Sequence, residues 1–269
     1  MTIHALFSKC PLDLHALTEL ESITISGTPR TGLKPLFDNL AKLYASSPRL
    51  TSLEVQCYSR LAPGVGEVNT LHHLFHMCNN KSPPYRLRHL GLDSCFVRLD
   101  KVTLPHLRHL TSLNLGIAFN EPLLAPNVAS SPDEIWRNFI GSGIHLEELR
   151  HDSITMSLID YLSSYSGLKK LRLTFETWSD NRKHWAAADP FFNKCLVNHV
   201  DTLEELAIVA HYESPWNFCS NNSMSIAKCT KLKLLTMNIY LELGEETNST
   251  QWELPDNNVV VSHGSLTMF

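Results

Sequence analysis

The amino-acid sequence predicts an α/β fold, a solenoid in which short parallel strands form a concave sheet and irregular helices cover the convex side. Three observations lead to this prediction: a recurring leucine pattern, side chains that alternate within it, and helix-like spacing between its copies. The pattern is L-x-x-L-x-L, with some replacements inside it. Its copies begin at Leu20, Leu50, Leu87, Leu110, Leu146, Leu168, Leu203 and Leu232.

Each copy of the pattern predicts one short strand. Alternate side chains of a strand point to opposite faces, so the leucines enter a core and the residues between them face outward. One such repeat cannot bury its apolar face alone, so the copies must stack into a leucine-rich-repeat solenoid, or horseshoe. Several intervals exceed the usual repeat length of about 20–29 residues, which indicates insertions between the strands.

Helices are predicted between the strands. Apolar residues recur at helix spacing over 36–43, 71–78 and 158–162. A helix start is predicted at 131–134, where a serine cap, a proline and two acidic residues follow one another. The Ser-Gly pair at 166–167 predicts a helix end just before the next strand.

Two regions are predicted along the chain. Residues 1–241 form the leucine-rich-repeat solenoid of about eight repeats. Beyond Tyr240 the leucine pattern gives way to a polar stretch at 244–250 and then to three valines at 259–261. Because an open solenoid end exposes strand edges and core, residues 242–269 are interpreted as a C-terminal capping segment or tail.

The composition is that of a globular chain of 269 residues, with 43% hydrophobic and 19% charged residues. A net charge of -4 argues against nucleic-acid and anionic-membrane partners, which attract clustered lysine and arginine. No apolar run reaches membrane-spanning length, and residues 1–14 lack the features of a secretory signal. Seven cysteines without a C-x-x-C pair indicate reduced thiols, and the expected compartment is the cytoplasm or nucleus.

The repeats at 87–92 and 168–173, the long variable connections and the Pro-Arg-Leu-Thr-Ser-Leu phrase at 48–53 resemble the leucine-rich domains of fungal F-box proteins. The resemblance spans about residues 17–241. It implies a ribonuclease-inhibitor-like horseshoe that, in that family, is the substrate-recruiting arm of a cullin ubiquitin ligase. No F-box is visible ahead of the repeats, so contact with the cullin-ligase adaptor is expected only where an upstream F-box exists.

The outward strand positions can be aligned from repeat to repeat, because parallel neighbours lie roughly 5 Å apart. This alignment places Arg150 beside Arg172 and Lys170 beside Glu148. Two neighbouring guanidinium groups suit a carboxylate or phosphate on a partner, which each binds with two hydrogen bonds. In the other interpretation the two arginines form a solvated surface network with Glu148 and Asp152. All five residues are candidate partner-binding residues.

Large aromatic residues in the insertions suggest a second partner-binding surface along one rim of the solenoid. They are Tyr58, Phe119, Trp178, Trp185, Tyr212 and Trp216. Loops on a rigid scaffold often carry recognition, and aromatic residues often dominate interfaces. The other interpretation is that these rings cover the ends of the core. The candidate anchors are Trp178, Trp185 and Trp216.

The histidine cluster of the predicted helix 71–78 is the first candidate for a metal site. His72 and His76 have the one-turn spacing that zinc sites use, and His73 and Cys78 lie nearby. Third and fourth ligands are not evident, and the histidines fall outside the apolar stripe of the helix. No metal ligand is therefore predicted.

Catalytic and cofactor patterns also fail. The Gly-Val-Gly triplet at 64–66 lacks the third glycine of a dinucleotide site, since Asn69 stands there. His151 replaces a core leucine of the fifth repeat and is interpreted as a hydrogen-bonded core residue. His106 and His109 are interpreted as turn or surface residues. No catalytic residue and no cofactor are predicted.

The expected function is that of a non-enzymatic, intracellular protein-binding scaffold. A protein client is expected on the concave face or the insertion rim, as in the substrate-recognition or adaptor modules of ubiquitin ligases that the repeats resemble. Two further possibilities remain: a truncated or stand-alone leucine-rich structural protein without a ligase role, and a hydrolase with a non-obvious site.

Overall fold

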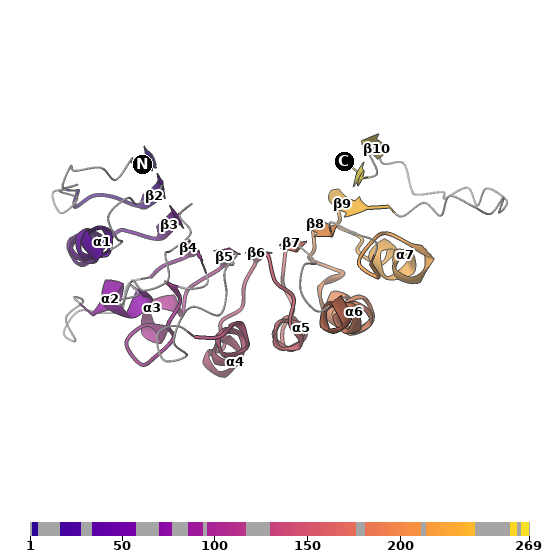
Figure 1. Ribbon diagram of the computed structural model, residues 1–269, viewed down its shortest axis with the longest axis horizontal. Coiled ribbons are helices and arrows are strands. Elements are labelled where there is room, and N and C mark those ends of the chain that lie inside the picture. The colour runs from indigo at the N-terminus through magenta and orange to yellow at the C-terminus, as the bar shows by residue number, and fades with distance from the viewer. Residues whose placement is uncertain are drawn as a thin grey trace. The chain divides into compact units, whose positions relative to one another are not determined.

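The computed structural model describes residues 2–4, 17–27, 34–57, 70–76, 86–93, 96–116, 130–175, 181–210, 214–239, 259–262 and 265–268. The chain divides into two compact units, residues 1–146 and residues 147–269. Each unit is an α/β layer pair in which helices lie along one side of a set of parallel strands (Figure 1).

The first unit contains five described strands, which pair in chain order and in parallel. They are β1 (Thr2–His4), β2 (Ser22–Gly27), β3 (Ser52–Cys57), β4 (His89–Asp93) and β5 (Ser112–Gly116). The helices of this unit are α1 (Lys34–Ser46), α2 (Leu71–Phe75), α3 (Leu104–Leu107) and α4 (Pro132–Ser142). Helices α1, α2 and α3 each connect two consecutive strands, and those strands are parallel neighbours in the sheet.

The second unit begins with four parallel strands: β6 (Glu148–His151), β7 (Lys170–Phe175), β8 (Glu205–Ala210) and β9 (Leu234–Asn238). Its helical segments are α5 (Met156–Ser163), α6 (Asn181–Pro190), the π-helix η2 (Phe191–Cys195), the 3₁₀-helix η3 (Leu196–His199) and α7 (Ser220–Ala227). Two antiparallel strands, β10 (Val259–Ser262) and β11 (Ser265–Met268), end it, with β11 antiparallel to β9. The backbone within the predicted capping segment thus covers an edge that β9 would otherwise leave open.

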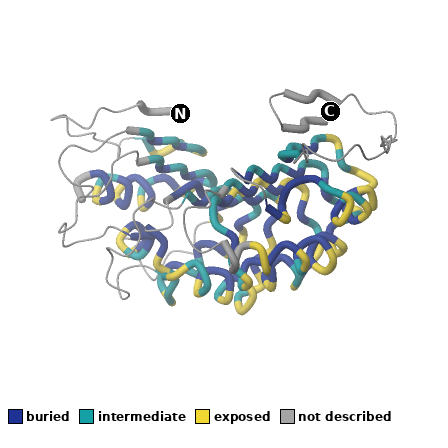
Figure 2. Tube along the Cα trace, turned by 45° about the vertical axis from the view of Figure 1, so that its right-hand side comes forward, coloured by how far each residue is buried: buried dark blue, intermediate teal, exposed yellow. Residues whose placement is uncertain are grey.

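All eight predicted strands are present, and each begins two residues after the opening leucine of its pattern. Buried residues alternate with more exposed ones along β2, β3 and β5 to β9 (Figure 2), as the period of two requires, whereas the outward Gly91 of β4 is buried. In β2, for example, Ile23 and Ile25 are buried while Ser22 and Thr24 are partly exposed. The prediction of stacked parallel strands with helices between them is confirmed.

One backbone contact recurs where neighbouring strands begin. In the second unit the N–H groups of Lys169 and Lys170 both donate to the carbonyl oxygen of Glu147, at 2.7 and 3.0 Å. The N–H groups of Glu204 and Glu205 donate to the carbonyl of Lys169 in the same way. Because these bonds hold successive repeats at one register, outward side chains at equal positions become neighbours.

The core lies between the strands and the helices. Its largest fully buried side chains include Trp136, Tyr161 and Trp216. His106 is also buried, and its ring stacks on that of Phe75 with centroids 4.5 Å apart, so the interpretation of His106 as a surface residue is wrong. Burial lowers the pKa of His106 because the interior disfavours the charged imidazolium.

The helix ends agree with the sequence at α4 and differ at α5. Ser131 caps α4 by accepting a hydrogen bond from the N–H of Glu134, whose carboxylate accepts one from the N–H of Ser131. Helix α5 ends at Ser163, before the predicted end at 166–167. Gly167 instead takes a φ of +114°, a left-handed conformation that suits the turn into β7.

Candidate functional site

The outward face of β6, β7 and β8 carries two neighbouring rows of charged side chains. The register pairs Glu148 with Lys170 and Lys170 with Glu205, which forms the first row. The second row, two residues further along each strand, pairs Arg150 with Arg172. The predicted alignment of these outward positions is therefore confirmed.

Lys170 forms ion pairs with both glutamates of the first row. Its Nζ lies 3.1 Å from Oε1 of Glu148 and 3.8 Å from Oε1 of Glu205. These contacts raise the pKa of Lys170, the hydrogen bond with Glu148 contributing most. Each such surface ion pair stabilises the fold by at most about 1 kcal/mol, because solvent screens it. Their larger effect is to leave little acidic charge available to the neighbouring row.

A further row of ion pairs lies just before the strands, at positions that the sequence analysis did not consider. Lys169 pairs with Glu147 at 2.8 Å, and Lys233 pairs with Glu204 at 2.7 Å. The sequence carries a signal for this row, since acid and base alternate at the second position of four successive repeats. Glu147 and Glu204 in this row therefore each form an ion pair with a lysine.

Arg150 and Arg172 differ from Lys170 in their surroundings. Both side chains are exposed, and neither forms an ion pair with any residue that the structure describes. The carboxylate of Asp152 instead lies 3.8 Å from Nδ1 of His151. The predicted surface network of the arginines with Glu148 and Asp152 is absent from the ion pairs of the described residues. Arg150 and Arg172 are thus neighbours in the parallel register, and neither is neutralised by an ion pair within the part of the chain that the structure describes.

The three candidate tryptophans differ in how the structure places them. Trp178 lies outside the described residues, as do Tyr58, Phe119 and Tyr212. Trp185 on α6 is 45% exposed and stays a candidate contact residue. Trp216 is fully buried, with its ring centroid 5.2 Å from that of Phe191 and 5.8 Å from that of Phe192. The hypothesis that Trp216 anchors a partner is therefore wrong, because its ring fills the core beneath η2.

His151 is buried at the position of the missing core leucine. It lies opposite Leu173 in the parallel register, and its Nδ1 faces the carboxylate of Asp152. The burial confirms that His151 is a core residue, whereas 3.8 Å is longer than a hydrogen bond, so the hydrogen bonding of this ring stays a prediction.

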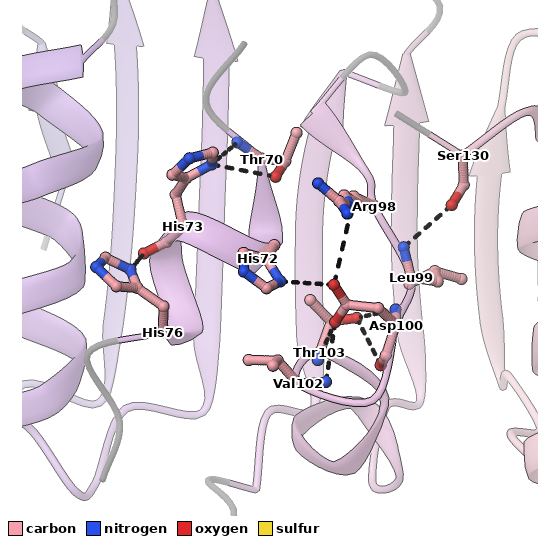
Figure 3. Close-up of polar contacts among 10 residues, drawn as sticks. All are labelled: Thr70, His72, His73, His76, Arg98, Leu99, Asp100, Val102, Thr103 and Ser130. Atoms are coloured by element: carbon pink, nitrogen blue, oxygen red, sulfur yellow. Dashed lines mark hydrogen bonds and ion pairs between the residues drawn. The ribbon is translucent and has the colours of Figure 1, made fainter. Parts of the chain in front are cut away.

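The histidines of α2 spread apart and do not converge on one point (Figure 3). Nδ1 of His72 lies 2.5 Å from Oδ2 of Asp100, while Nδ1 of His73 faces the backbone N–H of Thr70 at 3.4 Å. His76 contacts the carbonyl oxygen of His73. Among the described residues no group of three or more His, Cys, Asp or Glu side chains could hold a metal ion. Cys78 lies outside the described residues.

Asp100 is a junction that the sequence analysis missed. Its Oδ1 accepts hydrogen bonds from the N–H groups of Val102 and Thr103, at 2.9 and 3.0 Å. Its Oδ2 faces His72 and, at 3.8 Å, Nε of Arg98 (Figure 3). Burial alone raises the pKa of Asp100, but the hydrogen bonds from Thr103, Val102 and His72 outweigh it and hold this pKa below its ordinary value. The arrangement joins α2 to the segment that leads into α3.

The chain is an α/β protein of stacked parallel strands. Charged side chains lie in rows at the outward positions of β6, β7 and β8. No protein-family model and no curated protein matches the chain. No helix among the residues that the structure describes is long and apolar enough to cross a membrane.

Proposed function

We propose that this chain is a leucine-rich-repeat protein-binding module, a non-enzymatic scaffold that holds an acidic or phosphorylated segment of a client protein on its outward strand face. The eight L-x-x-L-x-L strands and their parallel pairing support the repeat class. Paired strands suit such a site, since they hold the backbone at fixed spacing before binding, so that only the side chains have to be ordered.

One observation carries the proposal: Arg150 and Arg172 lie directly opposite each other, exposed, without an acidic partner among the described residues. Neighbouring cations repel, and a fold gains nothing from that repulsion unless a bound anion relieves it. The two side chains originate from strands roughly 5 Å apart. Each guanidinium presents a planar fork of N–H donors that matches a carboxylate or phosphate group.

The surroundings favour an anionic segment over a single small anion. Lys170 and its two glutamates form a row beside the arginines, so a bound chain can place an acidic group on the arginines and a neutral or basic residue on that row. Ala207 lies beside Arg172 in the register and leaves space on β8 for the backbone of a bound segment. The proposed ligand is therefore an extended segment with one dominant negative group.

Fluorescence anisotropy with three labelled peptides tests the proposal. One peptide contains a phosphoserine flanked by glutamates, the second replaces phosphoserine with glutamate, and the third is a serine and glutamine analogue without charge. We expect the first two to bind and the third to fail. The Arg150→Ala/Arg172→Ala variant should lose at least about tenfold in affinity, because each lost hydrogen bond to a charged group costs about 1.5–3 kcal/mol.

A matched control is the Lys169→Ala/Lys233→Ala variant. It removes the same amount of positive charge from the same unit, but these two lysines already pair with Glu147 and Glu204. Its affinity for the phosphopeptide should stay within about threefold of the wild-type value. Equal losses in both double variants would reduce the effect to net charge and would contradict the proposal.

A recruitment role would extend this proposal. The likeness to leucine-rich arms of fungal F-box proteins suggests that the client is presented to a cullin ubiquitin ligase. Co-purification of a cullin-ligase adaptor with the expressed chain would support that role. Binding of clients without such an adaptor would leave a stand-alone binding module.

A further inference from the structure

On the outward face of the first unit, two side-chain amides orient the carboxylate of Glu54 on β3. Its Oε1 accepts hydrogen bonds from Nε2 of Gln56 at 2.8 Å and from Nδ2 of Asn114 at 3.2 Å. Gln56 lies on the same strand, whereas Asn114 lies on β5, two strands away. Both amide groups therefore donate to the same carboxylate oxygen, Oε1.

Gly91 makes this arrangement possible. It lies on β4 between Glu54 and Asn114 in the register, and it has no side chain above the sheet. A Cβ atom at this position would stand 2.5 Å from Cγ of Glu54. The glutamate side chain thus crosses the intervening strand through space that only glycine leaves open.

The unused atoms of this cluster are acceptors. An amide that directs its NH₂ group at a carboxylate directs its oxygen elsewhere, so Asn114 offers Oδ1 as an acceptor. Oε2 of Glu54 has no hydrogen bond or ion pair with any described residue. A negative charge and an acceptor oxygen are thus available together, and neither is matched by a cation of the described chain.

We propose that this cluster binds a lysine ammonium or arginine guanidinium group of a protein partner. Both groups carry a positive charge and several N–H donors and no acceptor, which complements a carboxylate and an amide oxygen. The neighbouring outward residues Thr24, Ser52 and Ser112 are small, and the ring of His89, which lies between Ser52 and Ser112, is held by the Ser112 hydroxyl 2.9 Å from its Nδ1. A divalent metal ion fits poorly, because one carboxylate cannot supply the several charged oxygens that such ions require.

The inference is independent of the anion site, since it concerns the other unit and the opposite charge. If both hold, the client carries basic as well as acidic groups. A failure at Glu54 would leave the arginine proposal intact, and the Arg150→Ala/Arg172→Ala variant should bind a basic probe as well as the wild type does.

The test uses hexalysine as the probe and the full chain labelled with ¹⁵N. We expect a saturable shift of the side-chain amide signals of Asn114 and Gln56 at low salt. In the Glu54→Gln variant, which keeps the size of the side chain, the dissociation constant measured by these shifts should rise about tenfold or more. The control is Glu19→Gln, which removes an exposed acid paired with Arg49 in the same unit and should leave the shifts unchanged.

A second variant guards against a general charge effect. Gly91→Ala keeps every charge but displaces the Glu54 side chain, so it should weaken hexalysine binding while the circular dichroism spectrum stays that of the wild type. Hexalysine binding that is equal in the wild type and Glu54→Gln, or shifts that map to other acidic residues, would overturn the proposal.

Discussion

Nδ1 of His72 lies 2.5 Å from Oδ2 of Asp100, and this contact connects helix α2 to the segment before α3. The same carboxylate caps two backbone N–H groups. Asp100→Ala should therefore lower the free energy of unfolding by about 1–3 kcal/mol, since two partly buried N–H donors lose their acceptor. Urea unfolding measures this effect, and the exposed Asp38→Ala on α1 is the control, with a change within about 0.5 kcal/mol.

The pH dependence of this contribution has a defined sign. The pKa of Asp100 is lower in the folded chain than its ordinary value, so its contribution is fully present above that ordinary value, near 3.8. The contribution is lost as the pH falls through the folded pKa. The difference in stability between the wild type and Asp100→Ala should accordingly shrink below about pH 3.8; a difference that stays constant would contradict the assignment.

His199 gives a second pH effect, in a higher range. Its Nε2 donates to the carbonyl of Leu162 at 2.9 Å, and its Nδ1 accepts from the N–H of Leu168 at 3.3 Å, so the buried ring is neutral. Burial lowers the pKa of His199. Because the unfolded chain binds a proton more readily, stability should fall as the pH drops below about 6.5.

His199→Leu should remove this part of the pH dependence. It should also cost about 1–3 kcal/mol at neutral pH, because it leaves the carbonyl of Leu162 and the N–H of Leu168 without their partner. Urea unfolding between pH 7 and pH 5 measures both effects. An unchanged slope of stability against pH in the variant would contradict the neutral, buried state of His199.

Two glycines should respond oppositely to alanine. Gly141 lies in the exposed part of α4 with no atom within 4 Å of an added Cβ, so Gly141→Ala should stabilise the chain by about 0.5–1 kcal/mol. Gly91→Ala should destabilise it by about 1 kcal/mol, because the new methyl group displaces Glu54 and breaks its hydrogen bond with Asn114. Thermal unfolding compares both variants with the wild type. Stabilisation by Gly91→Ala would show that Glu54 does not cross β4.

Substitution of the two described tryptophans of the insertions should destabilise the chain to different extents. Trp216→Ala empties a fully buried site beside Phe191 and Phe192 and should cost about 3–5 kcal/mol. Trp185→Ala removes a half-exposed ring and should cost less than about 1 kcal/mol. Denaturant unfolding gives the costs, and acrylamide quenching should affect the Trp185 fluorescence far more than that of Trp216. Comparable quenching of both rings would contradict the burial of Trp216.

The strands and the register of the arginines could be predicted from the sequence because both depend on local periodicity. Alternating leucines encode burial directly, and equal positions in stacked repeats become neighbours, as Arg150 and Arg172 do. The horseshoe itself, the extent of the solenoid over 1–241 and the role of 242–269 stay predictions.

Contacts between distant segments could not be predicted in this way. His72 and Asp100 are separated by 28 positions, and no local pattern links them. The burial of His106 depends on stacking with Phe75, and the burial of Trp216 depends on the π-helix η2. The pairing of Lys170 with both of its glutamates depends on side-chain conformations that the repeat pattern does not specify.

The most direct test of the proposed function follows the Nε–Hε signals of Arg150 and Arg172 during titration with the phosphoserine peptide. Both signals should shift together, with one dissociation constant, and the uncharged analogue should leave them in place. Addition of salt should weaken the binding, because the arginines are exposed. Arginine signals that stay in place while the peptide binds elsewhere, or that respond equally to the uncharged analogue, would contradict the proposed anion-binding face.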